Sequence, residues 1–152
     1  MRHFWLFVHL AGFTVWLGGA LAAMTLGIML RREPRDQVAA WVRALGAIYR
    51  FLILPGCLAA TVSGLVLTLI MYGGPAAAAG VSHYLMAMQG TGVLAAVITL
   101  VFLVPNAGKQ MRVDPVSQAP LFDALRAKQA RFGMISGVLG LLALLTGALG
   151  RP

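Results

Sequence analysis

The chain has 152 residues, of which 60% are hydrophobic and only 11% are charged, and its mean hydropathy is +0.86. Soluble domains carry about 25% charged residues, so a chain of this size cannot hide its apolar surface from water, and membrane lipid is the expected surrounding. The net charge of +8 predicts no nucleic-acid partner, because the basic residues lie between apolar runs rather than along one face.

Two apolar runs in the first half of the chain predict two transmembrane helices, since a span needs about 20 apolar residues. The first is expected at 4–30 and is followed by the charged segment 31–35. The second is expected at 51–72 and is preceded by a short helix that runs into it. Pro55 lies early in the second span, where it removes a backbone donor, so we expect a kink or a loosened turn there.

Two further spans are expected at 82–104, closed by Pro105, and at 132–149. The segment 116–131 is weakly amphipathic at helical spacing and is expected to lengthen the fourth span. We found no sign of a second domain. The sequence therefore predicts an all-α fold, in which residues 1–152 form a single integral membrane four-helix bundle.

The basic residues predict the orientation of this bundle. The predicted loops 31–50 and 105–131 hold ten lysines and arginines, whereas the opposite side has only Arg2 and Arg151. Loops rich in lysine and arginine stay in the cytoplasm. Both termini and the turn at 73–80 are therefore expected on the non-cytoplasmic side of a bacterial-type inner (plasma) membrane, in a multi-pass protein.

His9 is the polar residue of greatest interest in the first span. It lies about five residues into the span, which is roughly 8 Å from the outer end. An imidazole without a partner is costly there, so His9 is expected either to hold a ligand or to bond a backbone carbonyl. Trp5 and Trp16 lie on the same side of the helix. Aromatic neighbours suit a flat macrocycle, and they also suit ordinary core packing.

The third span begins on the same side of the membrane as the first and carries His83, Met86 and Met88. Met88 is at a depth close to that of His9, and His83 is about one turn shallower. A His–Met or His–His pair between two helices suits haem b, and the same residue types suit copper(I). Met86 and Met88 face different sides, and a methionine in a span is most often a packing residue.

The sequence lacks the residues that several other classes of protein require. The predicted spans contain no Asp, Glu, Lys or Arg, which argues against a proton-driven transporter or pump. There is no phosphate loop, no HExxH motif and no paired carboxylate set for hydrolysis. The single cysteine, Cys57, allows no internal disulfide.

Short motifs in three spans resemble a known group of small membrane proteins. His9 is followed by VWLGG at 15–19, the second span contains YRFLILPG at 49–56, and the fourth has Arg131 and Phe132 leading to Gly137 and Gly140. The pattern is similar to the superfamily of the HemJ-type protoporphyrinogen oxidases, the copper-resistance CopD membrane domain and uncharacterised predicted integral membrane proteins. The resemblance covers most of the chain.

The resemblance implies a haem b site. HemJ-type enzymes hold haem with a histidine in the first helix and a lysine early in the third, and His9 matches that histidine. The segment 84–88 falls on the family's aromatic-Leu-His-x-Lys pattern, with Met86 in place of the histidine and Met88 in place of the lysine. The family's Arg- and Tyr-rich end of the first helix and its Asn-Glu-x-Pro stretch are absent, which leaves enzyme activity open.

Three functions are consistent with these patterns. The first is a haem b-binding membrane protein with a redox or haem-handling role, in which His9 is one axial ligand and Met88 or His83 the other, with Trp16 beside the site. The second is copper handling through His9, His83, Met86 or Met88. The third is a non-catalytic subunit of a larger membrane complex, for which small residues along the helices are suitable packing faces. A homo-oligomer is also consistent with the sequence.

Overall fold

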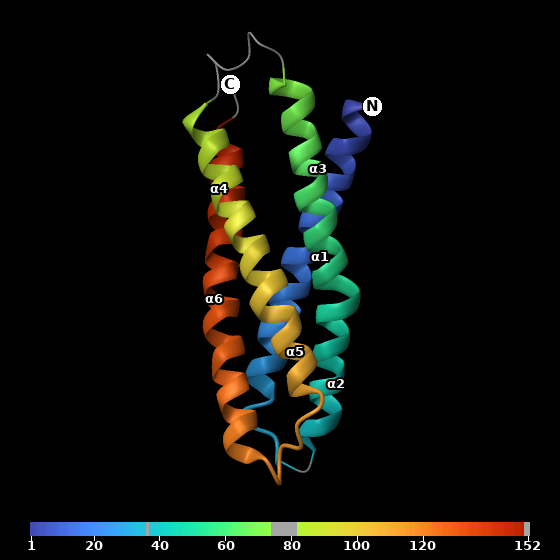
Figure 1. Ribbon diagram of the computed structural model, residues 1–152, viewed down its shortest axis with the longest axis vertical. Helices are drawn as coiled ribbons and strands as arrows, with labels where there is room; N and C mark the ends of the chain where they lie inside the picture. The colour runs from blue at the N-terminus through green and yellow to red at the C-terminus, as the bar shows by residue number, and fades with distance from the viewer. Residues whose placement is uncertain (36, 74–81, 151–152) are drawn as a thin grey trace.

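The computed structural model describes residues 1–35, 37–73 and 82–150 (Figure 1). These residues form helices and no strands, and four helical rods are long and apolar enough to cross a membrane. The all-α, four-helix fold predicted from the sequence is thereby confirmed. The rods are α1 (Arg2–Met29), then α2 (Val38–Ile48), η1 (Tyr49–Ile53) and α3 (Leu54–Tyr72), then α4 (His83–Ile98), η3 (Thr99–Leu103) and α5 (Val104–Gln110), and finally α6 (Ala119–Leu149).

The rods associate mainly as two hairpins. α1 packs along α3, and α4 packs along α6, with fewer contacts between the two pairs. Figure 1 shows the start of α1 and the end of α6 at one end of the bundle, here named the terminal end, and residues 30–35 and 111–118 at the opposite end, named the loop end. The predicted turn at 73–80 lies almost entirely outside the described residues, as does Arg151.

The second and third helical rods continue through Pro55 and Pro105, because a short π-helix precedes each proline. The backbone N–H of Leu54 donates to the carbonyl of Tyr49, five residues back, just before Pro55. Val104 donates to Thr99 in the same way just before Pro105. The wider turn accommodates the proline ring and its missing donor. The loosened turn predicted at Pro55 is therefore present, whereas the helix predicted to close at Pro105 continues to Gln110.

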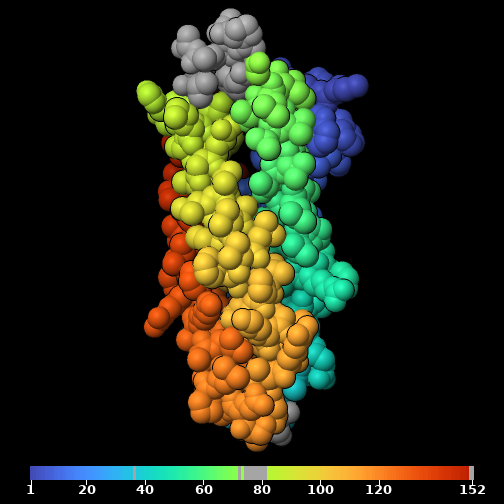
Figure 2. All heavy atoms as spheres, viewed as in Figure 1, coloured from blue at the N-terminus to red at the C-terminus, as the bar shows by residue number. Residues whose placement is uncertain are grey.

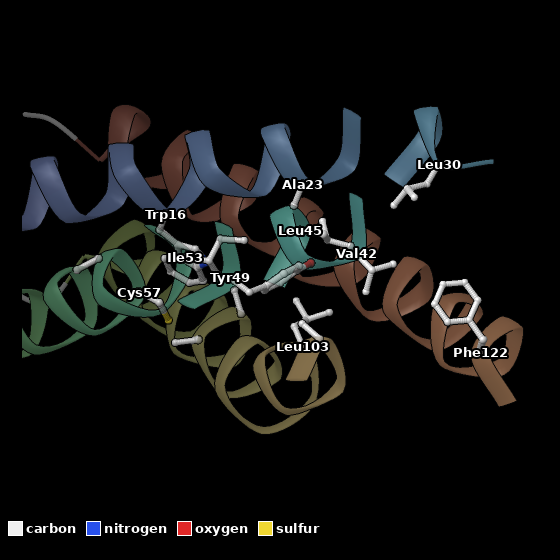
Figure 3. Packing of buried hydrophobic residues seen from close by; sticks show 14 of the residues in the cluster. Trp16, Ala23, Leu30, Val42, Leu45, Tyr49, Ile53, Cys57, Leu103 and Phe122 are labelled. Carbon is white, nitrogen blue, oxygen red and sulfur yellow. The ribbon is translucent and has the colours of Figure 1, made fainter. Parts of the chain in front are cut away.

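The crossing of α1 and α3 requires glycine. A Cβ placed on Gly12 would lie 2.7 Å from the backbone nitrogen of Ala60, and one on Gly56 would lie 2.7 Å from that of Trp16. The two backbones therefore touch, as small residues allow in apolar surroundings. Figure 3 shows Trp16, Ile53 and Cys57 together beside this crossing, and all three are buried.

A group of buried amides joins η3 and α5 to α6, within one hairpin, near the loop end. The Asn106 side chain donates to the Gln129 side-chain oxygen at 2.5 Å and to the Leu125 carbonyl at 2.9 Å. Gln110 donates to the same Leu125 carbonyl at 3.3 Å, and Gln129 donates to the carbonyl of Leu103 at 3.3 Å. Within the described residues, no buried side-chain nitrogen or oxygen lacks a partner. Such satisfied networks fix how helices pack.

Burial differs sharply between two regions along the bundle. The terminal region, defined as residues 1–11, 64–73, 82–94 and 144–150, has no buried side chain among those described. The loop region, defined as residues 23–35, 37–57 and 95–136, holds most of the buried core. Figure 2 shows a narrow opening between α3 and α4 towards the terminal end. The hairpins are thus closely joined at one end and less closely at the other.

Candidate functional site

His9 lies in α1, and its ring reaches α3. Its Nδ1 atom is 2.8 Å from the carbonyl oxygen of Ala60. A carbonyl can only accept a hydrogen bond, so Nδ1 carries the proton. In the neutral ring the lone pair then belongs to Nε2, which is the arrangement that a metal-ligating histidine uses. The carbonyl bond and the ligand role, considered as alternatives in the sequence, are therefore compatible.

Two neighbours on α3 hold the imidazole in place. A Cβ on Gly64 would lie 2.9 Å from Cε1 of His9, so the ring occupies space that only glycine leaves. Ser63 is fully buried, and its Oγ lies 3.4 Å from Nδ1 of His9. Ser63 also donates to the carbonyls of Ala59 and Ala60. The side chain of His9 is consequently oriented by one helix face.

Trp16 lies two turns from His9 towards the loop end and is 7% exposed. Its ring meets that of Phe13 edge to face, with centroids 6.1 Å apart and an interplanar angle of 75°. The backbone of Trp16 also abuts Gly56 at the helix crossing. These contacts are those of a core residue, and Trp16 is therefore positioned as a wall of the α1–α3 interface.

Met88 lies in the other hairpin. A Cβ placed on Gly147 would be 2.8 Å from the Met88 sulfur, so this side chain packs on α6. Met86 is 61% exposed, and His83 is exposed at the first turn of α4. All these residues are in the terminal region with His9. The contacts of Met88 nevertheless belong to the α4–α6 interface, and those of His9 belong to the α1–α3 interface.

One side-chain hydrogen bond joins α3 and α4 in the terminal region. The Gln89 side-chain nitrogen donates to the Thr68 hydroxyl at 2.5 Å. Neither residue was a candidate in the sequence, and neither was Ser63. Gln89 could have been found as the polar residue that follows Met88 in the third span, and Ser63 as a polar residue within the second span.

The described residues fit one axial ligand of a haem, Nε2 of His9, and leave the second undecided between Met88 and His83. Within residues 1–35, 37–73 and 82–150, no three His, Cys, Asp or Glu side chains gather closely enough to hold a metal ion. That finding concerns sites with three such ligands. A haem iron takes only one or two protein ligands, so the haem and copper hypotheses stay predictions.

Comparisons with protein-family models, with curated proteins and with solved structures give no match to this chain. The resemblance to the HemJ and CopD group therefore stays a prediction that depends on the short motifs quoted above. Any functional proposal has to be supported by the residues of the chain itself.

Proposed function

We propose that this is a multi-pass membrane protein that binds haem b through His9, with a redox or haem-handling role. The hydrogen bond from His9 Nδ1 to the Ala60 carbonyl carries this proposal, because it leaves Nε2 as the free ligand atom and fixes the ring. Four helices long enough to span a bilayer support the membrane part. A bound haem would supply a one-electron iron couple at this position.

The proposed orientation places the loop end in the cytoplasm and both termini on the other side. It is supported by the basic residues of the connections and adjoining helix ends at the loop end, among them Arg31, Arg32, Lys109 and Arg112. His9 would then lie in the outer leaflet, in the more open part of the bundle. The opening between α3 and α4 at this end (Figure 2) suits a cofactor that enters between the two hairpins.

The haem proposal is tested by absorption spectra of the full chain, produced with ample haem and purified in detergent. We expect a Soret band in the wild type and its loss in His9→Ala. His3→Ala is the matched control, because His3 is also on α1 but is exposed at the chain end. A wild-type protein without a Soret band, or a His9→Ala protein that keeps it, would contradict the proposal.

The second ligand is assigned by comparing Met88→Leu with His83→Ala. Loss of a methionine ligand is expected to lower the reduction potential, since methionine ligation raises it. His83→Ala would instead abolish the low-spin spectrum if His83 were the ligand. Copper handling and a subunit role stay predictions, since no contact among the described residues favours either of them.

A further inference from the structure

A pocket of about 130 Å³ lies at the loop end, where the end of α1, the start of α2 and the start of α6 meet. It is amphipathic. Leu30, Val38 and Phe122 form its apolar part, and all three are buried. Pro115, three arginines and two acidic residues line the remainder, and the charged ones are Arg31, Arg35, Arg126, Glu33 and Asp123. The charged side chains of the lining therefore carry a net positive charge, as do protein sites that bind lipid headgroups.

The three arginines are held differently. Arg35 is paired with Asp123 at 2.8 Å and donates to the Pro115 carbonyl at 3.2 Å, so its charge is largely compensated. Arg126 donates to the carbonyl of Gly27 at the end of α1, at 3.4 Å. A guanidinium has five N–H donors, so Arg126 keeps donors for another acceptor.

Positive charges crowd at this pocket. Burial lowers the pKa of Arg126, the positive charges of Arg31 and Arg35 lower it further, and the carboxylate of Asp123 acts in the opposite direction. Glu33 is the other acidic residue in the lining. An anion placed between Arg31 and Arg126 would relieve the repulsion between them.

We propose that this pocket binds the phosphate group of an anionic phospholipid, with Arg31 and Arg126 as its ligands. Arginine binds phosphate oxygens through parallel N–H donors. The volume is sufficient, because an apolar cavity of roughly 150 Å³ admits benzene, which has more heavy atoms than a phosphate group. The site lies where four apolar helices end, which is the level of lipid headgroups in the proposed membrane orientation, so a phospholipid headgroup is the phosphate group that reaches it.

Native mass spectrometry of the detergent-purified full chain, offered equal amounts of phosphatidylglycerol and phosphatidylcholine, tests this proposal. We expect preferential retention of phosphatidylglycerol. Arg126→Gln and Arg31→Gln should each lower that retention about tenfold, as expected for loss of one charge-assisted hydrogen bond. Arg31→Gln is included because Arg31 is exposed, whereas Arg126 also donates to the Gly27 carbonyl, so its loss could disturb the packing of α6 on α1.

Two variants provide matched controls. Arg112→Gln removes the same charge at the same end of the bundle but outside the pocket, so retention should stay within twofold of the wild type. Glu33→Gln removes the opposing carboxylate and should raise retention. An equal loss in Arg112→Gln and Arg126→Gln, or no preference for phosphatidylglycerol, would overturn the proposal and leave Arg126 as a cap of α1 only.

Inorganic phosphate at the same concentration as the lipid, compared with chloride at equal ionic strength, separates the two sources of a phosphate group. Retention of phosphatidylglycerol under this competition supports the lipid as the occupant. Displacement by phosphate but not by chloride would overturn the lipid as the occupant, because free phosphate would then bind this site more tightly than the lipid does. The inference depends on the proposed membrane insertion but not on haem, so a protein that requires detergent for extraction and retains no anionic lipid would disprove this inference alone.

Discussion

The loop region and the terminal region are built from similar apolar helices but are held together by different means. In the loop region, the buried amides of Asn106, Gln110 and Gln129 join α5 to α6 within one hairpin. The two hairpins are linked there by Arg126, which donates to the Gly27 carbonyl, and by the ion pair of Arg35 with Asp123. In the terminal region, within residues 1–35, 37–73 and 82–150, a single side-chain hydrogen bond links the hairpins, between Gln89 and Thr68.

We interpret the loop region as the scaffold of the bundle and the terminal region as the place of the proposed site. A tightly packed end with satisfied polar groups specifies how four apolar helices assemble, since in the proposed lipid surroundings such helices have little hydrophobic reason to associate. The more open end is where a ligand could enter, and it contains His9, His83 and Met88. Binding groups placed on a rigid scaffold but outside its densest packing are the usual arrangement in proteins.

The largest effect is expected from Gln129→Leu, which would remove the centre of the amide network. Asn106 and Gln110 would lose their shared acceptor at Gln129, and their side chains are only 4% and 2% exposed. Leaving buried donors unpaired should lower the free energy of unfolding by about 3 kcal/mol. Unfolding in mixed micelles, followed by circular dichroism, measures the change.

Gln89→Leu is the matched variant in the terminal region. It removes one hydrogen bond at a half-buried position, and interhelical hydrogen bonds in membranes contribute about 0.6 kcal/mol on average. Equal losses in Gln129→Leu and Gln89→Leu would show that polar side chains contribute alike at the two ends of the bundle.

The next effect in size concerns the helix crossing. Gly56→Ala should lower the free energy of unfolding by about 2 kcal/mol, because the added Cβ would meet the backbone of Trp16, which cannot move aside. Gly137→Ala is the control on α6, where a Cβ would meet nothing within 4 Å. That variant should be neutral or stabilising by up to about 1 kcal/mol, as helix propensity alone predicts. The same unfolding measurement ranks them, and the opposite ranking would contradict the crossing.

The sequence predicted the four helices well, because length and apolar composition determine them almost alone. The sequence also predicted the loosened helical turn at Pro55, because a proline inside an apolar run removes a backbone donor. It ended the third helix too early at Pro105, because the π-turn that accommodates this proline depends on the backbone path from Thr99 to Val104 and has no residue signature. The continuous α6 was only partly foreseen, as an amphipathic segment leading into a span.

The candidate site was predicted less completely, for a physical reason. His9 stands out in a sequence as an imidazole among apolar residues, but its partner is a backbone carbonyl, that of Ala60, which every residue possesses. The depth of Met88 follows from counting residues, whereas its direction depends on how α4 is rotated about its axis. The packing of Met88 on Gly147 shows that rotation, and the sequence alone could not supply it.

The smallest expected effect is a change in the pKa of Asp114, a residue at the loop end. Asp114 lies in the connection between α5 and α6, where its carboxylate accepts from the Ser117 hydroxyl at 2.5 Å and from the backbone N–H groups of Val116 and Ser117. These bonds, the hydroxyl first, lower the pKa of Asp114 below its ordinary value of 3.8. Hydrogen bonds that favour the charged form act in this direction.

The sign of the pH dependence follows from that lowered pKa. The stabilisation by the Asp114 turn is fully present above the pKa of the unfolded chain and is lost as the pH falls through the lower pKa of the folded state. In an NMR titration of the carboxyl carbon in micelles, we expect the Asp114 midpoint below 3.8 and a rise towards that value in Ser117→Ala. Because the carboxylate is fully exposed, the melting temperature at neutral pH should hardly change. A midpoint that Ser117→Ala leaves unmoved would contradict the leading role of the hydroxyl and would assign the lowered pKa to the backbone N–H groups of Val116 and Ser117.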